Sequence, residues 1–248
     1  MQYLKARALA DSAITFDFAR AVGAEASALV HAAQLYLKQA MAEGNLPGAT
    51  EVMQAFCSVT LHYDCLATTQ ATLIAQVEAL LADVIVSARP NGRVWDLPCC
   101  YAGDFAPDMD SLAQRLAVDP AEIVAQHSQT ALVVYALGFL PGLPFMGDLP
   151  RSLALPRRTE PRTQVPAGSV AIANGLCVIY PWVSPGGWHI LGNCPIPLFD
   201  VEREAPALLA AGDAVRFRAI DADEHRDLVG QVRLGSLDPS MFMKAVQP

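Results

Sequence analysis

Three polar residues with the chemistry of a small-molecule site, Arg162, Gln164 and His189, lie in a stretch of the chain that is dense in proline and glycine. An arginine can hold a carboxylate or a developing negative charge, and a glutamine can both donate to and accept from an amide group. A histidine can transfer a proton near neutral pH. We predict catalytic roles for all three. The alternatives are that Arg162 braces loop carbonyls, that Gln164 lies on a polar rim, and that His189 is an ordinary strand residue.

The residues around these three predict a surface that binds the substrate. The segment from Ser184 to Trp188 can form a turn whose backbone N–H groups hold an anion beside the indole ring, or it can be a tight hairpin with a buried aromatic side chain. His127 has no Asp at a spacing typical of a nucleophile pair, so we expect it to have a supporting role. The candidate substrate-binding residues are His127, Pro141, Gly142, Ser184, Pro185, Gly186, Gly187 and Trp188.

Other charged residues nearby have plainer interpretations. Asp104 and Asp108 could act as acid–base groups or metal ligands, but acidic residues beside proline more often form caps and turns. Arg157 and Arg158 are expected to form a solvated face. The sequence has no zinc or calcium signature and no phosphate-binding P-loop, so no metal intrinsic to the chain is expected.

Turn chemistry predicts how the candidate residues meet. Two proline-bounded turns, at 161–166 and 181–187, are separated by apolar runs at 169–173 and 177–180, and Asn174-Gly175 joins these runs as a strong hairpin turn. After two antiparallel strands the chain is back at the end of the sheet from which the first of them started. Arg162 and Gly187 are therefore predicted to share one end of a barrel and to face each other across a cleft.

Hydrophobic periodicity predicts an α+β fold in two domains. Within residues 1–97, strands and helices are expected in the order β-α-β-β-α-β of a ferredoxin-like domain, with helices at 23–42 and 68–88 and the last strand at 93–98. Residues 98–248 contain two short helices, near 111–116 and from 119, and then closely spaced short strands to about 220. This pattern is typical of an antiparallel β-barrel. The segment 221–225 is polar, and 238–248 is expected to be a helical or loose tail.

Composition narrows the class of protein. The 248 residues carry a net charge of −8, which argues against general nucleic-acid binding. No window of about 18 apolar residues predicts a membrane-spanning helix, and the N-terminus lacks the pattern of a signal peptide. The six cysteines form no C-x-x-C pair and are expected to be reduced and mostly buried. We therefore expect a cytoplasmic protein.

Five motifs follow one another in the second half of the chain. They are Gly138-Phe-x-Pro-Gly-x-Pro-Phe, Pro161-Arg-Thr-x-Val-Pro-Ala-Gly-Ser-Val, Tyr180-Pro, Ser184-Pro-Gly-Gly-Trp and Pro197-Leu-Phe-Asp. In this order and spacing they resemble the KipI / PxpB family, whose members are labelled as the B subunit of 5-oxoprolinase or as allophanate hydrolase subunit 1. The resemblance is dense over residues 99–218 and implies an α/β domain followed by a cyclophilin-like β-barrel.

The resemblance also implies a function. It implies the B subunit of an ATP-dependent complex that hydrolyses a lactam or another amide, with a PxpC/KipA-type partner and a PxpA-type third subunit. ATP and Mg²⁺ would then bind only in the complex. Two alternatives within the same family are a KipI-like inhibitor of a sensor histidine kinase and a carboxyltransferase-type module of a urea or allophanate pathway.

The chain departs from the family pattern at four places, which indicates a divergent member. Val183 stands where the family has Glu, and Gln164 stands where it has a second Arg. Asn193-Cys194 replaces an Arg-Thr pair, and the segment 102–106 replaces Gly-Gly-Glu-Phe-Gly. The loss of one carboxylate and two guanidinium groups removes charge-assisted contacts that would serve an anionic ligand.

Overall fold

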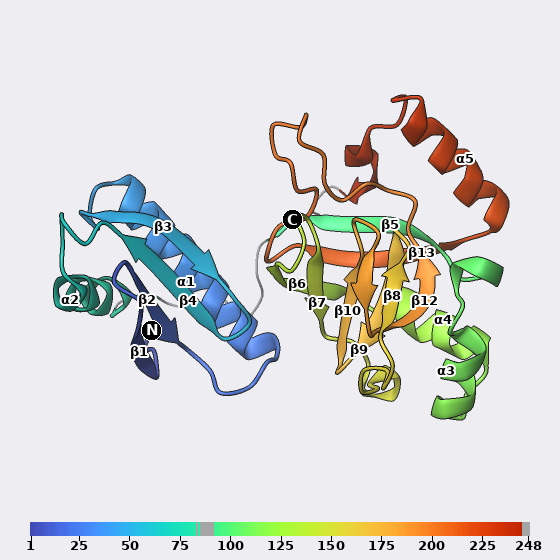
Figure 1. Ribbon diagram of the computed structural model, residues 1–248, viewed down its shortest axis with the longest axis horizontal. Coiled ribbons are helices and arrows are strands. Elements are labelled where there is room, and N and C mark those ends of the chain that lie inside the picture. Colours follow the sequence, from blue (N-terminus) through green and yellow to red (C-terminus); the bar gives the residue numbers. More distant parts are fainter. Residues whose placement is uncertain (83, 85–91, 245–248) are drawn as a thin grey trace. The chain divides into compact units, whose positions relative to one another are not determined.

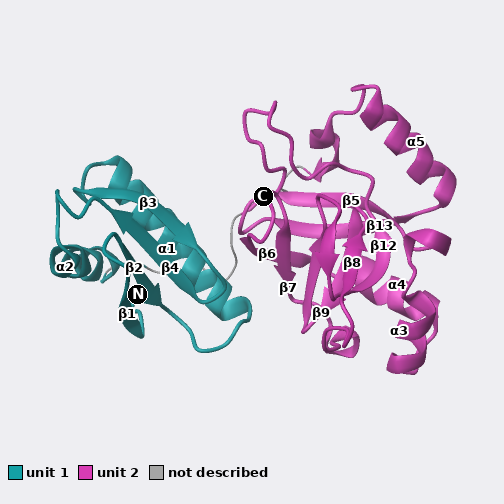
Figure 2. Cartoon of the chain, viewed as in Figure 1, with its two compact units in different colours: residues 1–91 teal, residues 92–248 magenta. Residues whose placement is uncertain are grey.

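The computed structural model describes residues 1–82, 84 and 92–244 and divides the chain into two compact units, residues 1–91 and 92–248 (Figure 2). The α+β class, with an N-terminal α/β unit followed by a closed barrel, is confirmed. Part of one expected feature, the continuation of the second helix to Ala88, lies outside the described residues. So does the end of the expected C-terminal tail. None of the described helices is long and apolar enough to cross a membrane.

The first unit is a four-stranded antiparallel sheet with the order β1-β2-β4-β3, together with two helices (Figure 1). Its elements are β1 (Lys5–Leu9), β2 (Ala13–Asp17), α1 (Ala24–Ala42), β3 (Ala49–Gln54), β4 (Ser58–Tyr63) and α2 (Gln70–Leu81). Helix α1 buries Val30, Ala33, Leu37 and Ala40, a spacing of three and four residues that presents one apolar face to the sheet. The hydroxyl of Thr69 caps α2 by accepting from the Thr72 N–H at 3.2 Å.

Two details of the first unit differ from the sequence prediction. An additional strand, β1, precedes the expected first strand, which forms as β2, and the two strands make a hairpin that turns at Ala10 with a φ of 53°. The strand expected at 93–98 forms as β5 (Val94–Cys100), but it pairs with strands of the second unit. The units accordingly divide between Asn91 and Gly92 instead of after residue 97. Local periodicity shows that a strand forms, but it does not identify the partner.

The second unit contains β5 and all later elements. They are a 3₁₀ turn at Gly103–Phe105, α3 (Met109–Leu116), α4 (Pro120–Gln129), β6 (Leu132–Leu137), β7 (Pro144–Gly147), a 3₁₀ turn at Arg151–Leu153, β8 (Arg162–Val165), β9 (Ser169–Ala173), β10 (Leu176–Ile179), β11 (Ser184–Gly186), β12 (His189–Asn193), β13 (Ala214–Ile220), α5 (Ala222–Arg233), a 3₁₀ turn at Pro239–Phe242 and β14 (Met243–Lys244). Helix α5 begins within the segment 221–225, for which the sequence indicated only a polar character, and continues to Arg233.

Seven strands close the barrel in the order β12-β9-β10-β7-β6-β13-β5, and a bridge between Asn193 and Cys100 completes the ring. The expected antiparallel pairing holds except between β5 and β13, which run parallel from Val94 and Ala214 to Cys100 and Ile220. These two strands are far apart in the chain, so no hairpin constrains their direction. The barrel interior is filled by apolar side chains that include Trp95, Leu97, Val170, Ile172, Leu191, Val215 and Phe217.

A second, smaller apolar cluster lies on the outside of β9 and β10. Strand β9 turns Val170 and Ile172 to the main core and Ala171 and Ala173 to the smaller cluster, which also contains Val165, Val178, Tyr180 and Trp188. The short pair β8–β11 thus covers one face of the barrel wall. The predicted Asn174-Gly175 hairpin turn between β9 and β10 is confirmed, with φ values of 52° and 75°.

Candidate functional site

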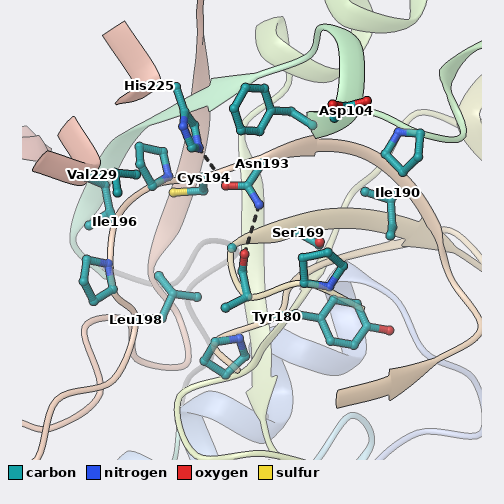
Figure 3. A pocket seen from close by; sticks show the side chains of 18 of the residues that line it. Asp104, Ser169, Tyr180, Ile190, Asn193, Cys194, Ile196, Leu198, His225 and Val229 are labelled. Atoms are coloured by element: carbon teal, nitrogen blue, oxygen red, sulfur yellow. Dashed lines mark hydrogen bonds between the residues drawn. The ribbon is translucent and has the colours of Figure 1, made fainter. Parts of the chain in front are cut away.

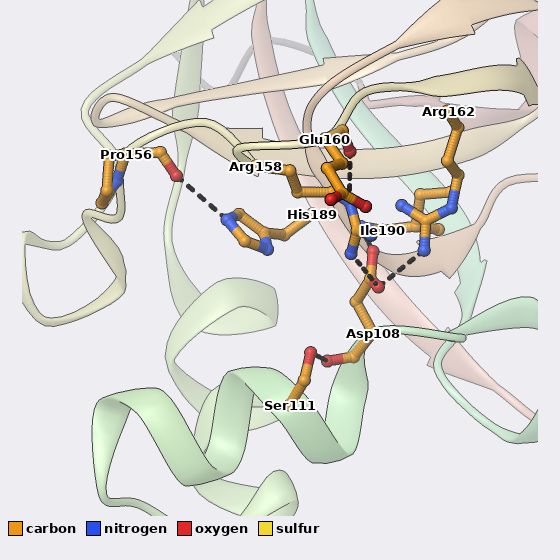
Figure 4. A network of polar contacts seen from close by, with 8 residues as sticks. All are labelled: Asp108, Ser111, Pro156, Arg158, Glu160, Arg162, His189 and Ile190. Carbon is orange, nitrogen blue, oxygen red and sulfur yellow. Dashed lines mark hydrogen bonds and ion pairs between the residues drawn. The ribbon is translucent and has the colours of Figure 1, made fainter.

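A buried carboxylate, Asp108, joins three segments of the barrel unit (Figure 4). Its side chain is 4% exposed. Oδ1 accepts from Arg162 Nη2 at 2.6 Å and from Arg158 Nη1 at 3.0 Å, while Oδ2 accepts from the Ile190 N–H at 2.7 Å. One carboxylate therefore faces two guanidinium groups.

Strands β8 and β11 bring the predicted residues together. Arg162 is the cross-strand partner of Gly186, and the Arg158 N–H donates to the Gly187 carbonyl at 2.8 Å. Arg162 and this glycine pair lie close together as predicted, but they meet as paired backbone of the two-stranded sheet β8–β11 and not across a cleft at one end of the barrel. Neither glycine has a φ in the left-handed region, so the anion nest considered for Ser184–Trp188 is absent.

Three buried polar atoms of the predicted residues have no hydrogen-bond partner within the described part of the chain: Arg162 Nη1, Ser184 Oγ and His189 Nδ1. The other ring nitrogen of His189 lies 3.0 Å from the Pro156 carbonyl. Because a carbonyl only accepts, Nε2 carries a proton, and in the neutral tautomer that this contact selects Nδ1 is an acceptor. A buried unsatisfied group costs about 1–3 kcal/mol, so native proteins keep such groups where water, a ligand or a partner completes them.

A small aromatic cavity of about 150 Å³ adjoins the β8–β11 pair. Its walls include Phe139, Phe145, Arg157, Tyr180, Pro185, Gly186, Gly187 and Trp188. The Arg157 guanidinium lies over the Trp188 ring, 5.6 Å from its centroid. Burial raises the pKa of Tyr180, while Arg157 and Arg162 nearby lower that pKa. The cavity thus combines aromatic walls with a cation.

The solvated setting expected for Arg157 and Arg158 holds for only one of them. Arg157 is exposed and has no ion pair among the described residues, whereas Arg158 is half-buried and pairs with Asp108. A guanidinium that is held by cation–π contact and lacks a counter-charge is suited to bind a carboxylate. No sequence pattern indicated this contact, because the cation and the indole are 31 positions apart.

A larger cavity of about 560 Å³ is shown in Figure 3, and Tyr180 lines both this cavity and the aromatic cavity. Ile190, the residue whose N–H binds Asp108, is also on its wall. Its polar side chains include Asp104, Ser169, Asn193, His225 and Arg233. None of the residues predicted as catalytic or substrate-binding lines this cavity.

A family model described as carboxyltransferase domain, subdomain C and D, matches residues 4–209. The chain belongs to this family. The 5-oxoprolinase B subunit of Bacillus subtilis (strain 168) is 36% identical over 228 residues, which are 88% of this chain and 93% of that protein. This relative confirms the resemblance to the KipI / PxpB family.

Solved structures share the fold of this carboxyltransferase C/D chain. TTHA0988 superposes with a TM-score of 0.73 at 33% identity over 85% of the chain, and the match covers 40% of TTHA0988. The urea amidolyase of K. lactis gives a TM-score of 0.74 at 17% identity, covering 96% of this chain and 16% of that protein. At that identity the likeness shows the fold alone.

The departures from the family pattern map onto the larger cavity and the surface. Asn193, Cys194 and two residues of the segment 102–106, Asp104 and Phe105, line the larger cavity. Val183 is 62% exposed, and Gln164 is exposed on β8. Two of these departures, at 102–106 and at Asn193-Cys194, lie about 90 positions apart in the sequence and meet in this cavity. They are the sequence signal that could have predicted it.

His127 lies in the core of this C/D barrel and not on a binding surface. It is fully buried, Nδ1 pairs with the Tyr101 hydroxyl at 2.8 Å, and Nε2 lies 3.4 Å from Cys177 Sγ. Its ring stacks on Phe217 with 4.7 Å between centroids. Both ring nitrogens are engaged, which makes the geometry that of a structural core residue.

The burial of His127 predicts a pH dependence of stability. Burial lowers its pKa to about 3. In the unfolded state His127 takes up a proton near pH 6.5, whereas in the folded state it does not. The free energy of unfolding is therefore highest above pH 6.5 and falls as the pH decreases toward 3. Urea denaturation followed by tryptophan fluorescence should show a steeper loss of stability over this range in the wild type than in His127→Gln. Parallel pH profiles would contradict the assignment.

Two further residues predicted to bind the substrate, Pro141 and Gly142, form a turn. Pro141 and Gly142 occupy the central positions of a turn closed by the Leu143 N–H to the Leu140 carbonyl at 3.1 Å, with a φ of 76° at Gly142. A Cβ at Gly142 would lie 2.8 Å from Phe199 Cβ, so the glycine permits a close approach of two loops. Neither residue lines the two cavities described above.

The cofactor that the family implies does not fit the described residues of this chain. A triphosphate needs several uncommitted donors around it, but Arg158 and Arg162 are bound to Asp108, and Gly186 and Gly187 form no nest. Among the described residues, no group of three or more His, Cys, Asp or Glu side chains could hold a metal ion. Arg157, the cation beside the aromatic cavity that has no ion pair among the described residues, can bind a single carboxylate but not the several phosphates of a nucleotide.

Proposed function

We propose that this chain is the B-type subunit of a 5-oxoprolinase complex and that its barrel binds the lactam substrate. The observation that carries the proposal is the match to the 5-oxoprolinase B subunit of Bacillus subtilis (strain 168), which spans 93% of that protein. The chain would act with PxpC/KipA-type and PxpA-type subunits in a heteromeric complex, which would supply the ATP and Mg²⁺ site.

The aromatic cavity supports a role in binding the substrate. 5-Oxoproline is a small ring with one carboxylate and one amide, and the cavity offers aromatic walls and the Arg157 guanidinium. Hydrolysis breaks the ring C–N bond, adds the hydroxyl of water to the carbonyl carbon and its proton to nitrogen, and gives glutamate. In this proposal Arg157 holds the carboxylate, and Trp188 supports the ring.

The predicted catalytic residues would support this cavity from the barrel side. Arg162 pairs with Gly186 through the backbone and with Asp108 through its side chain, so it fixes the cavity wall. His189 presents Nδ1 as an acceptor without a partner in the described residues, which would suit an N–H donor once the complex rearranges the site. Gln164 is exposed on β8 and is available to a partner subunit.

Exposed apolar side chains on loops of the barrel favour a partner. Phe139, Trp182, Val183 and Val201 are 69%, 46%, 62% and 71% exposed. Loops that leave such side chains in water are typical of surfaces covered in a complex. The two alternatives, histidine-kinase inhibition and carboxyl transfer, have no comparable support, because the likeness to urea amidolyase is limited to the fold.

The proposal predicts that activity requires assembly. Co-expression with PxpC/KipA- and PxpA-type subunits should give a stable complex on size-exclusion chromatography that releases glutamate from 5-oxoproline with ATP. The isolated chain should release none, and omission of this chain should abolish turnover by the others. Separate peaks at micromolar concentration, or glutamate release by the other subunits alone at the full rate, would refute the proposal.

A further inference from the structure

The hydroxyl of Tyr180 is a hydrogen-bond donor without a partner on the wall of the aromatic cavity. Tyr180 is 3% exposed, and its ring packs with Val165 and Trp188 in the smaller apolar cluster. Within the part of the chain that the structure describes, its hydroxyl makes no hydrogen bond. A buried hydroxyl has given up its hydrogen bonds to water, so native proteins keep one unpaired where a ligand or a bound water completes it.

Gly186 shows on which side of the ring the hydroxyl lies. A Cβ built on Gly186 would collide with the hydroxyl oxygen of Tyr180 and would lie 2.9 Å from its Cζ, so the phenol rests directly against the backbone of β11. Gly186 lines the aromatic cavity and is not among the described residues of the larger one. Figure 3 shows the hydroxyl turned away from Asn193 and His225. The oxygen therefore belongs to the aromatic cavity, although Tyr180 borders both.

Two guanidinium groups act on this phenol. Burial raises the pKa of Tyr180, and Arg157 and Arg162 lower that pKa by less, so the hydroxyl keeps its proton at neutral pH and can donate. Arg157 lies over the Trp188 ring on the wall of the same cavity. An acceptor oxygen bound at the hydroxyl would therefore lie in the positive field of these cations, which stabilises negative charge on that oxygen.

We propose that Tyr180 recognises the lactam carbonyl of 5-oxoproline by donating its hydroxyl hydrogen to the carbonyl oxygen. The inference rests on the function proposed above and assigns a residue to the second acceptor group of that substrate. The carboxylate takes the Arg157 guanidinium, because a charge-assisted contact is stronger than one to a neutral hydroxyl, and this leaves the carbonyl for Tyr180. Tyr180 thus determines specificity for a lactam over a ring that lacks the carbonyl.

A structural role for the hydroxyl would need a partner within the fold. The hydroxyl of Tyr135 has one, since it donates to Asp148 Oδ1 at 2.6 Å, and the hydroxyl of Tyr101 pairs with His127 at 2.8 Å. Tyr180→Phe keeps the packed ring and removes only an oxygen that bonds to none of the described residues. The free energy of unfolding of this variant should therefore equal that of the wild type or exceed it.

Isothermal titration calorimetry with the full chain, alone and in the assembled complex, tests the proposal. The probes are 3-oxocyclopentanecarboxylate and cyclopentanecarboxylate, two rings of equal charge that differ only at the carbonyl. The wild type should bind the oxo ring about tenfold more tightly, because the other ring leaves the buried hydroxyl unpaired. Tyr180→Phe should bind both rings equally. Tyr63→Phe, which alters a buried tyrosine of the first unit, is the control and should keep the preference.

Equal affinities of the wild type for the two rings, or a preference that survives in Tyr180→Phe, would overturn the proposal. So would the absence of binding of both rings to the chain and to the complex at millimolar concentration. Loss of the preference together with a lower free energy of unfolding in Tyr180→Phe would also overturn it, because the hydroxyl would then hold the fold.

The function proposed above can fail separately from this inference. A complex that prefers the oxo ring through Tyr180 but releases no glutamate from 5-oxoproline would contradict that function and leave the role of Tyr180 in recognising a ring carbonyl intact. A complex that releases glutamate and keeps its preference in Tyr180→Phe would contradict the role of Tyr180 alone.

Discussion

Replacing Arg157 by glutamine is expected to lower kcat/KM of the assembled complex for 5-oxoproline by about 10- to 100-fold. Arg157 is the exposed cation of the aromatic cavity, and it has no counter-charge among the described residues. Loss of a charge-assisted hydrogen bond to a carboxylate removes about 1.5–3 kcal/mol. Steady-state kinetics of glutamate release would measure the change, which should appear mainly in KM if the carboxylate is held equally in the ground and transition states.

Arg151→Gln is the matched control for this effect. Arg151 is also an exposed arginine, six positions earlier in the chain, and it does not line the aromatic cavity. Its replacement should leave kcat/KM within about twofold of the wild-type value. Similar losses in the two variants would show that the effect is one of overall charge and not of the cavity.

Replacing Asp108 by alanine is expected to lower the free energy of unfolding of the barrel unit by about 3–5 kcal/mol. The change removes the one carboxylate that accepts from Arg158, Arg162 and the Ile190 N–H. Two guanidinium groups would then lose their counter-charge, and a buried backbone donor would lose its acceptor. Asp110→Ala, on the exposed first turn of α3, should change the stability by less than about 0.5 kcal/mol.

Tryptophan fluorescence reports this effect specifically. The three tryptophans, Trp95, Trp182 and Trp188, all belong to the second unit, so their signal follows unfolding of the barrel and not of the N-terminal sheet. Urea titrations of both variants would give the two free energies. A loss in Asp108→Ala no larger than that in Asp110→Ala would contradict the assigned role of the carboxylate.

Local chemistry made much of the fold predictable. The helix spacing of α1 and the Asn174-Gly175 turn each depend on neighbours in the sequence, and each formed as expected. The location of Arg162 beside Gly186 also followed from counting two strands through that turn. Patterns with a short range in sequence therefore predicted both the elements and one long-range contact.

The missed features depend on partners that are distant in sequence. Membership of β5 in the barrel depends on pairing with β13, about 120 positions later. The role of Asp108 depends on arginines 50 and 54 positions away. Helix α5 was missed because its surface is polar, although Asp221 caps it by accepting from the Asp223 and Glu224 N–H groups, a signal present in the sequence.

The central claim is that the aromatic cavity of the barrel holds 5-oxoproline within the assembled complex. A structure of that complex with 5-oxoproline bound tests it most directly. The account predicts the carboxylate within hydrogen-bond distance of the Arg157 guanidinium and the ring against Trp188. A lactam bound elsewhere in the complex, with Arg157 in solvent and the cavity beside Trp188 empty, would contradict the account.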